Sequence, residues 1–154
     1  MRKFLIILLS IPTIVISQNT EKELTSLNKK KQITEARKSV KLWTTDLKEL
    51  RYNDVYSGLS PENKAIYDSI EWVEAIEQMM MPFGNLIERT EISSEFNDHI
   101  DGLENGYYVT FKYKCNYENT DKYSEEIIMK QDYKKNWKVL LFSYDFIPND
   151  NYKE

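Results

Sequence analysis

The stretch "GYYVTFKYKCNY", residues 106–117, decides the fold, because apolar and polar side chains alternate along it. The residues expected on one face are Val109, Phe111, Tyr113, Cys115 and Tyr117. Those expected on the other face are Thr110, Lys112, Lys114 and Asn116. This period of two is typical of a strand with one buried and one solvent-facing side. We therefore expect a sheet whose apolar face covers either a solid core or a ligand pocket.

Several segments after Gly84 share this period, which predicts four strands. They are expected at residues 85–96, 106–117, 123–131 and 136–144. The last segment is apolar on both faces, with Trp137, Val139 and Leu141 on one and Leu140, Phe142 and Tyr144 on the other. A strand with two apolar faces is typical of the middle of a sheet or of a self-association surface.

The residues before Gly84 have the period of a helix instead. One apolar stripe runs through residues 33–50, and its members are Ala36, Val40, Trp43, Leu47 and Leu50. Thr34 is the expected N-cap of this long first helix. A short helical turn is expected at residues 53–59.

A later helix has well-marked ends. Asp68 is the expected N-cap, Glu71 completes a capping box, and Pro82 and Gly84 end the helix. Helices followed by four strands predict an α+β fold, in which a curved four-stranded antiparallel sheet wraps the long first helix.

The N-terminal residues 1–17 have the layout of a signal peptide. Arg2 and Lys3 precede an apolar run, and Ser17 lies at the expected cleavage point. The run is shorter than the roughly 20 residues that span a bilayer. We expect export to the periplasm or the extracellular space, with cleavage near Ser17 and no stable membrane anchor afterwards. Retention as an uncleaved anchor is the alternative. Residues 18–32 are expected to form a polar leader, 33–148 the folded domain, and 149–154 a polar tail.

Charge and cysteine content exclude some functions. The chain has 25 acidic and 21 basic residues, which argues against a nucleic-acid partner. Cys115 is the single cysteine, so no internal disulfide is expected. Its inward position predicts an inert, buried thiol. Pairing of two chains through this thiol is the alternative.

Residues with catalytic potential are few. His99 is the only histidine, and an isolated histidine makes neither a metal site nor a catalytic triad. Asp46 borders the buried stripe, Asp54 suits a helix start, and Glu71 is explained by capping. We therefore expect no catalytic residue, no metal and no cofactor.

The interior of the domain is expected to be free of charged groups. Lys112 and Lys114 are assigned to the solvent face of their strand, balanced by Glu125 on the next strand.

A set of landmarks along the chain resembles a known family. They are Ala36, Trp43, Tyr52, Ser69, Trp72, the "MPFG" of residues 81–84, Arg89, the "NGYYVTFKY" of residues 105–113, Glu126, Trp137 to Val139, and Tyr144. In this order and spacing they resemble the DUF4019 family, which groups exported bacterial proteins of unknown function. The resemblance implies a cystatin-like or NTF2-like fold and brings no established chemistry.

The high aromatic content is the best functional signal in the sequence, with 11 tyrosines, 6 phenylalanines and 3 tryptophans. The residues predicted to contact a ligand are Trp43, Tyr56, Trp72, Tyr113, Tyr117 and Tyr144. We expect a non-enzymatic binding or interaction module that uses the cone or the free sheet face. Its partner is expected to be a small ligand or an envelope protein. A small NTF2-like enzyme of ketosteroid-isomerase type and a structural homodimer are the alternatives.

Overall fold

The computed structural model describes residues 14–151, with side chains from residue 25 onward. Its helices are α1 (Ile14–Lys48), α2 (Tyr52–Ser57), α3 (Pro61–Ile66), α4 (Ser69–Met80) and a 3-10 turn, η1 (Met81–Phe83). Its strands are β1 (Leu86–Asn97), β2 (Tyr108–Tyr117), β3 (Thr120–Gln131) and β4 (Trp137–Pro148). The strands form one antiparallel sheet in the order β1-β2-β3-β4. The predicted α+β fold, helices followed by a four-stranded antiparallel sheet, is confirmed.

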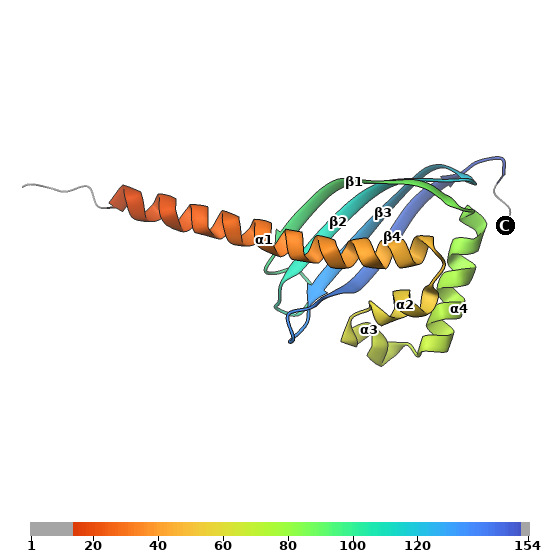
Figure 1. Ribbon diagram of the computed structural model, residues 1–154, viewed down its shortest axis with the longest axis horizontal. Helices are drawn as coiled ribbons and strands as arrows, with labels where there is room; N and C mark the ends of the chain where they lie inside the picture. Colours follow the sequence, from red (N-terminus) through yellow and green to blue (C-terminus); the bar gives the residue numbers. More distant parts are fainter. Residues whose placement is uncertain (1–13, 152–154) are drawn as a thin grey trace, which may run out of the picture.

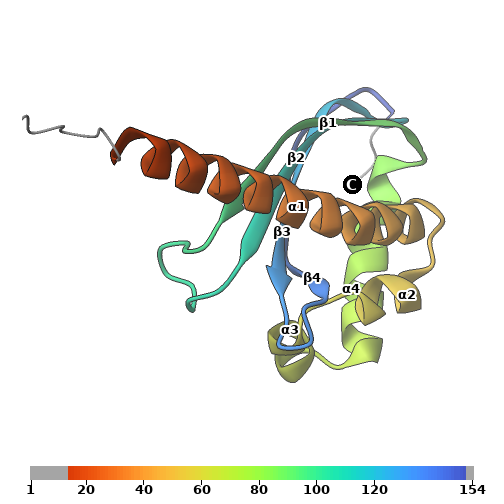
Figure 2. The ribbon, with the colours of Figure 1, turned by 60° about the vertical axis from the view of Figure 1, so that its left-hand side comes forward.

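The sheet curves around α1, which crosses its concave face (Figure 1). The shorter helices α2, α3 and α4 lie below the C-terminal half of α1 in the views of Figures 1 and 2. The N-terminal part of α1 extends past the sheet, and residues 25–31 are exposed there. The proposed signal peptide falls mostly on residues 1–13, outside the described part of the chain.

The predicted start of the first helix at Thr34 is wrong. The Oγ1 of Thr34 donates a hydrogen bond of 2.9 Å to the carbonyl of Lys30, one turn earlier in a continuous helix. The polar leader is rich in lysine, glutamate and glutamine, which favour helix. A threonine inside a helix satisfies its hydroxyl through such a bond, so it is not a cap here.

Leu50 was expected on the buried stripe of α1, and this is wrong as well. The helix ends at Lys48, and Leu50 follows in the left-handed region with φ of 58°. Its side chain is exposed. The other members of the stripe are buried. The spacing is helical up to Leu47 only, and the turn into α2 places Leu50 outside the core.

The core lies between α1 and the concave face of the sheet. Val40 and Trp43 of α1 pack there with Phe111 of β2 and Ile127 of β3. Burial of the apolar surface between α1 and the sheet, at roughly 25 cal/mol per Å², is the main stabilising term.

Asp68 caps α4 as predicted, since its side chain accepts hydrogen bonds from the amides of Ile70 and Glu71.

β4 is an edge strand, so its predicted place in the middle of the sheet is wrong. Leu141 pairs with Ile128 and Val139 with Met129, which leaves Leu140 as the extra residue of a β-bulge. A bulge shifts the alternation by one residue. Val139 therefore faces inward before the bulge and Phe142 after it, while 47% of Leu141 is exposed. The two apolar faces read from the sequence are one inner face, interrupted by this bulge.

Candidate functional site

A buried ion pair lies inside the concave face. The guanidinium of Arg89, on β1, binds the carboxylate of Glu125, on β3, through two hydrogen bonds of 2.7 and 2.9 Å. The hydroxyl of Tyr117, on β2, donates a third bond of 2.8 Å to Glu125. The side chains of Arg89 and Glu125 are 10% and 0% exposed. The expectation of an interior free of charges is wrong.

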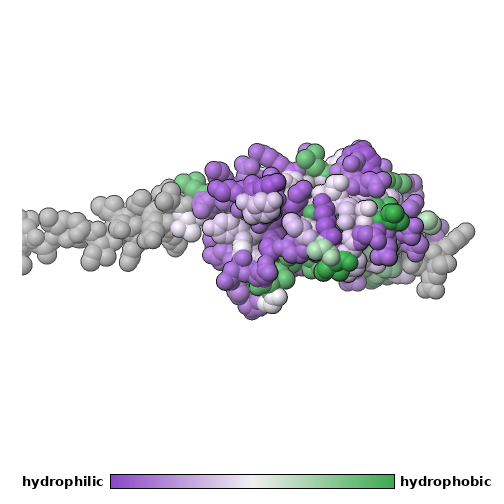
Figure 3. All heavy atoms as spheres, turned by 90° about the horizontal axis from the view of Figure 1, so that it is seen from below, coloured by the Kyte–Doolittle hydropathy of each residue, from purple (hydrophilic) through white to green (hydrophobic). Residues whose placement is uncertain are grey.

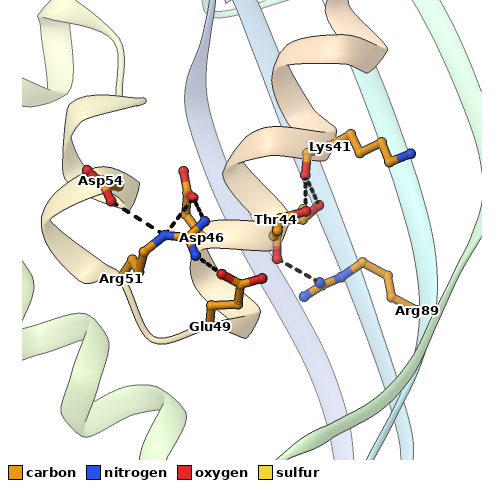
Figure 4. A network of polar contacts seen from close by, with 8 residues as sticks. Lys41, Thr44, Asp46, Glu49, Arg51, Asp54 and Arg89 are labelled. Atoms are coloured by element: carbon orange, nitrogen blue, oxygen red, sulfur yellow. Dashed lines mark hydrogen bonds and ion pairs between the residues drawn. The ribbon is translucent and has the colours of Figure 1, made fainter.

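The same arginine ties the sheet to α1. One nitrogen of Arg89 donates to the carbonyl of Thr44 at 3.2 Å (Figure 4). Burial disfavours the charge of Arg89, but the hydrogen bonds and charge of Glu125 outweigh it and raise the pKa of Arg89 above its usual value. The pair is therefore a charged, fully engaged clamp between helix and sheet.

Glu125 was assigned to the solvent face, and its place differs because of strand parity. Tyr123, Ile127 and Met129 are buried on β3, and Glu125 belongs to the same alternating row. Lys112 on the outer face pairs instead with Glu126, at 2.9 Å. The sequence therefore did contain a signal for the buried carboxylate, because Glu125 is the one acid within an alternating row of apolar residues.

The thiol and phenols beside this pair are held in their neutral forms. Burial and the nearby charge of Glu125 raise the pKa of Cys115 to about 12. Burial, followed by the charge of Glu125, also raises the pKa of Tyr117. A protonated, buried thiol is a poor nucleophile. Cys115 is accordingly buried as predicted, without exposure for pairing two chains.

A second arginine–glutamate pair lies nearer the rim of the sheet. Arg37 of α1 donates to Glu91 of β1 at 2.8 and 3.0 Å and to the hydroxyl of Ser94 at 2.8 Å. The side chains of Arg37 and Glu91 are 42% and 28% exposed. The hydrogen bonds from Arg37 lower the pKa of Glu91, against the opposing effect of burial.

Two of the carboxylates considered for acid–base chemistry, Asp46 and Asp54, are engaged at the corner between α1 and α2. Arg51 forms ion pairs there with Asp46, Glu49 and Asp54 (Figure 4). Glu71 lies at the start of α4, next to its N-cap. The three carboxylates around Arg51 support the geometry of the corner between α1 and α2.

A groove of about 540 Å³ lies between α4 and the edge strand β4. Its lining residues are Leu59, Asn63, Tyr67, Glu71, Trp72, Ala75, Ile76, Met79, Val139, Leu140, Leu141 and Phe142. Most of these side chains are apolar or aromatic. Figure 3 views the molecule from below, the side of α3 and α4 in Figure 1, and shows small apolar groups between polar ones. The groove is an open apolar surface beside the closed core.

A second hollow, of about 370 Å³, lies where α1 ends and β1 begins. Leu47, Tyr52, Met80 and Leu86 supply apolar walls. Tyr117 also lines this hollow, and its hydroxyl donates a hydrogen bond to Glu125. This hollow is therefore connected to the buried ion pair through one phenol.

The six residues predicted to contact a ligand lie in different places. Trp72 lines the groove between α4 and β4, and Tyr56 packs behind it with ring centres 5.8 Å apart. Trp43 is in the core, where its indole donates to the carbonyl of Val55 at 2.9 Å. Tyr117 lines the second hollow.

The remaining two predicted residues lie on the sheet. Tyr113 is buried close to Arg37 and Glu91, and Tyr144 stacks on Tyr123 at 5.7 Å. The sequence did not indicate Met79, Ile76 or Leu141 as groove residues. These three residues line the groove because of the distance between α4 and β4, which is a tertiary property that a local sequence pattern does not contain.

Other types of site find little support in the described residues. Within residues 14–151, no three histidine, cysteine or acidic side chains are grouped so as to hold a metal ion. His99 lies on an exposed loop, 3.2 Å from Asp101. No described helix is both long and apolar enough to cross a membrane.

The fold and the site together define a class: an α+β domain in which a buried arginine–glutamate pair clamps a long helix onto a curved antiparallel sheet. A family model described as "Protein of unknown function (DUF4019)" matches residues 39–142, and the chain belongs to this family. No curated protein and no solved structure matches the chain. The finer likeness to cystatin-like or NTF2-like folds stays a prediction.

Proposed function

We propose that this chain is an exported, non-enzymatic binding module whose ligand occupies the groove between α4 and β4. The observation that carries the proposal is the groove itself, whose walls combine Trp72 and Met79 with Phe142. Its volume of about 540 Å³ lies within the roughly 300–1,000 Å³ of known ligand pockets. Aromatic and methionine side chains favour contact with an apolar group.

The state of the ionisable groups supports binding rather than catalysis. A general base must reach a proton of its substrate with an available lone pair. Both oxygens of Glu125 already accept hydrogen bonds, from Arg89 and Tyr117. Raised pKa values keep Tyr117 and Cys115 protonated. These groups stabilise the fold and leave the groove as the surface available for recognition.

The chemistry of the groove favours a largely apolar ligand with a polar end. The polar side-chain groups of its lining residues are those of Asn63 and Glu71, the hydroxyl of Tyr67 and the indole N–H of Trp72. The amide nitrogen of Asn63 is already bonded to the carbonyls of Val139 and Leu140. Glu71 is exposed at the start of α4. We expect the apolar part of the ligand to contact Trp72 and Phe142.

A thermal-shift screen of the chain against small apolar molecules and peptides tests the proposal. Ala75→Trp fills the groove from an exposed position on α4, so a true ligand should lose at least about tenfold in affinity. Ala65→Trp, at an exposed position of α3 outside the groove, is the matched control. A screen with no ligand, or ligands whose affinity is unchanged by Ala75→Trp, would overturn the proposal.

A further inference from the structure

One wall of the groove is the outer edge of β4, and part of that edge is unpaired. The amide of Ser60 donates to the carbonyl of Val139 at 2.8 Å, and Asn63 covers the carbonyl of Leu140 at 2.8 Å. Beyond Leu140 no described residue outside β3 bonds the backbone of Leu141 to Asp145. An edge of this kind is a template for another strand.

The two edges of the sheet differ in their suitability for pairing. β1 has register shifts at Ile87 and at Ile92, which interrupt its ladder. Bulges and edge charges protect a strand from added partners. From Leu141 to Asp145 β4 pairs with β3 without a bulge, and the segment "LFSYD" contains no lysine and no proline. Asp145 is the one charged residue of this segment, so the edge of β4 is the less protected of the two.

The wall opposite this edge has one acidic side chain and no basic one. From Asp68 to Met80 the chain has no basic residue, and of the three glutamates of α4, Glu71, Glu74 and Glu77, the last lines the second hollow instead. Glu71 lines the groove directly. This acidic side chain on an otherwise uncharged wall favours a partner with lysine or arginine, because complementary charges steer and orient association.

We propose that the groove takes an extended basic–apolar segment of another protein, which adds to β4 along Leu141–Asp145 as a fifth strand. This inference rests on the proposed function and names the partner of the same site. In strand addition, main-chain hydrogen bonds hold the segment and alternate side chains enter pockets. Here apolar side chains enter beside Trp72 and Phe142, and basic ones lie near Glu71.

A second copy of the chain fits this surface less well. Among the described strands, a copy offers two free edges: β1, which register shifts interrupt, and its own β4, whose residues 139–147 contain no basic side chain. Such a pair would bring Asp145 of each copy to the shared edge without an opposite charge. Self-association is accordingly an outcome that the experiment must separate from peptide binding.

The test uses a nine-residue synthetic peptide that alternates lysine with valine, titrated into the isotope-labelled chain. We expect amide signals of residues 141–145 to shift and their hydrogen exchange to slow. A peptide with glutamate in place of lysine should bind at least about tenfold more weakly. A peptide methylated on alternate backbone nitrogens cannot donate the ladder hydrogen bonds, so its binding should be lost.

Variants of the chain complete the test. Glu71→Gln should weaken the lysine peptide several-fold, whereas Glu95→Gln, on the outer face of β1, should leave it unchanged. Equal binding of the methylated peptide, or shifts outside β4 and α4, would overturn the inference. Light scattering that shows a dimer dissociated by the peptide would also overturn it, by making a second copy the occupant. If small apolar ligands sensitive to Ala75→Trp bind but the lysine peptide does not, this inference fails while the proposed function stands.

Discussion

The concave side of the molecule has a closed half beneath α1 and an open half facing α4. Each half contains a tryptophan beside the same residue of β4, Phe142. Trp43 contacts Phe142 at 5.3 Å between ring centres and is buried. Trp72 is half-buried, and it shares the groove with Phe142. Similar aromatic residues therefore fill the core where a helix lies on the sheet and line an open groove where a helix stands away from it.

The buried ion pair of the closed half should show the largest effect. Glu125→Ala leaves the charge of Arg89 buried without its partner, which costs about 3–5 kcal/mol of unfolding free energy. The double variant Arg89→Met/Glu125→Leu should recover most of this loss, because a well-packed apolar pair replaces a buried ion pair at little cost. Urea unfolding followed by circular dichroism measures both. A loss below about 1 kcal/mol in Glu125→Ala would contradict the clamp.

The two tryptophans test the comparison directly. Trp43→Ala removes a buried ring and the hydrogen bond to Val55, so it should cost about 3–5 kcal/mol. Trp72→Ala should cost about 1 kcal/mol, because its side chain is already half in water. The same urea titration compares them, and equal losses would remove the distinction between the two halves. Ligand affinity should respond in the opposite order, since only Trp72 lines the groove.

A smaller effect is expected at Gly58, which packs against the closed half. A Cβ at this position would lie 2.5 Å from the Cδ1 of Trp43. Gly58→Ala therefore forces the indole or the α2 turn to move, at a cost of about 1–3 kcal/mol. Gly106→Ala is the matched control, because its nearest neighbour, the hydroxyl of Tyr108, is 3.6 Å away. The difference in melting temperature between these two variants measures the tightness of the packing around Trp43.

The sequence predicted the elements better than it predicted their faces. Alternation in residues 106–117 placed β2 and its buried row correctly, and helical spacing identified the stripe from Ala36 to Leu47. These patterns are local, and each follows from the geometry of one element. The bulge at Leu140 lies outside such patterns, because it is fixed by the register between β3 and β4.

The buried pair was missed for a different reason. Arg89 was recognised only as a landmark of the family, and Glu125 was taken as a partner of surface lysines. Each residue alone is typical of a solvent-exposed strand. Only the pairing of β1 and β3 with β2 brings the two charges together above Cys115. The groove could not be predicted from the sequence either, since its width depends on how far α4 lies from β4.

The half-exposed pair of Arg37 and Glu91 should give the smallest effect, and one that depends on pH. The folded pKa of Glu91 lies below its usual value of 4.5, so the folded state binds fewer protons than the unfolded state. Its contribution is fully present above about pH 4.5 and is lost as the pH falls through the lower, folded pKa. Since both side chains are partly in water, the contribution is about 0.2–1 kcal/mol.

Glu91→Gln should therefore lower the unfolding free energy at pH 7, and this loss should shrink as the pH falls below about 4.5, with Glu95→Gln on the outer face as the control. Urea titrations at a series of pH values measure the difference. A loss at pH 7 as large as that of Glu125→Ala would show that burial does not separate the two pairs. The hydrogen-bond geometries of the two pairs are alike, so the pairs differ mainly in burial. Equal losses would therefore mean that the depth of a charge within the fold does not decide its contribution to stability.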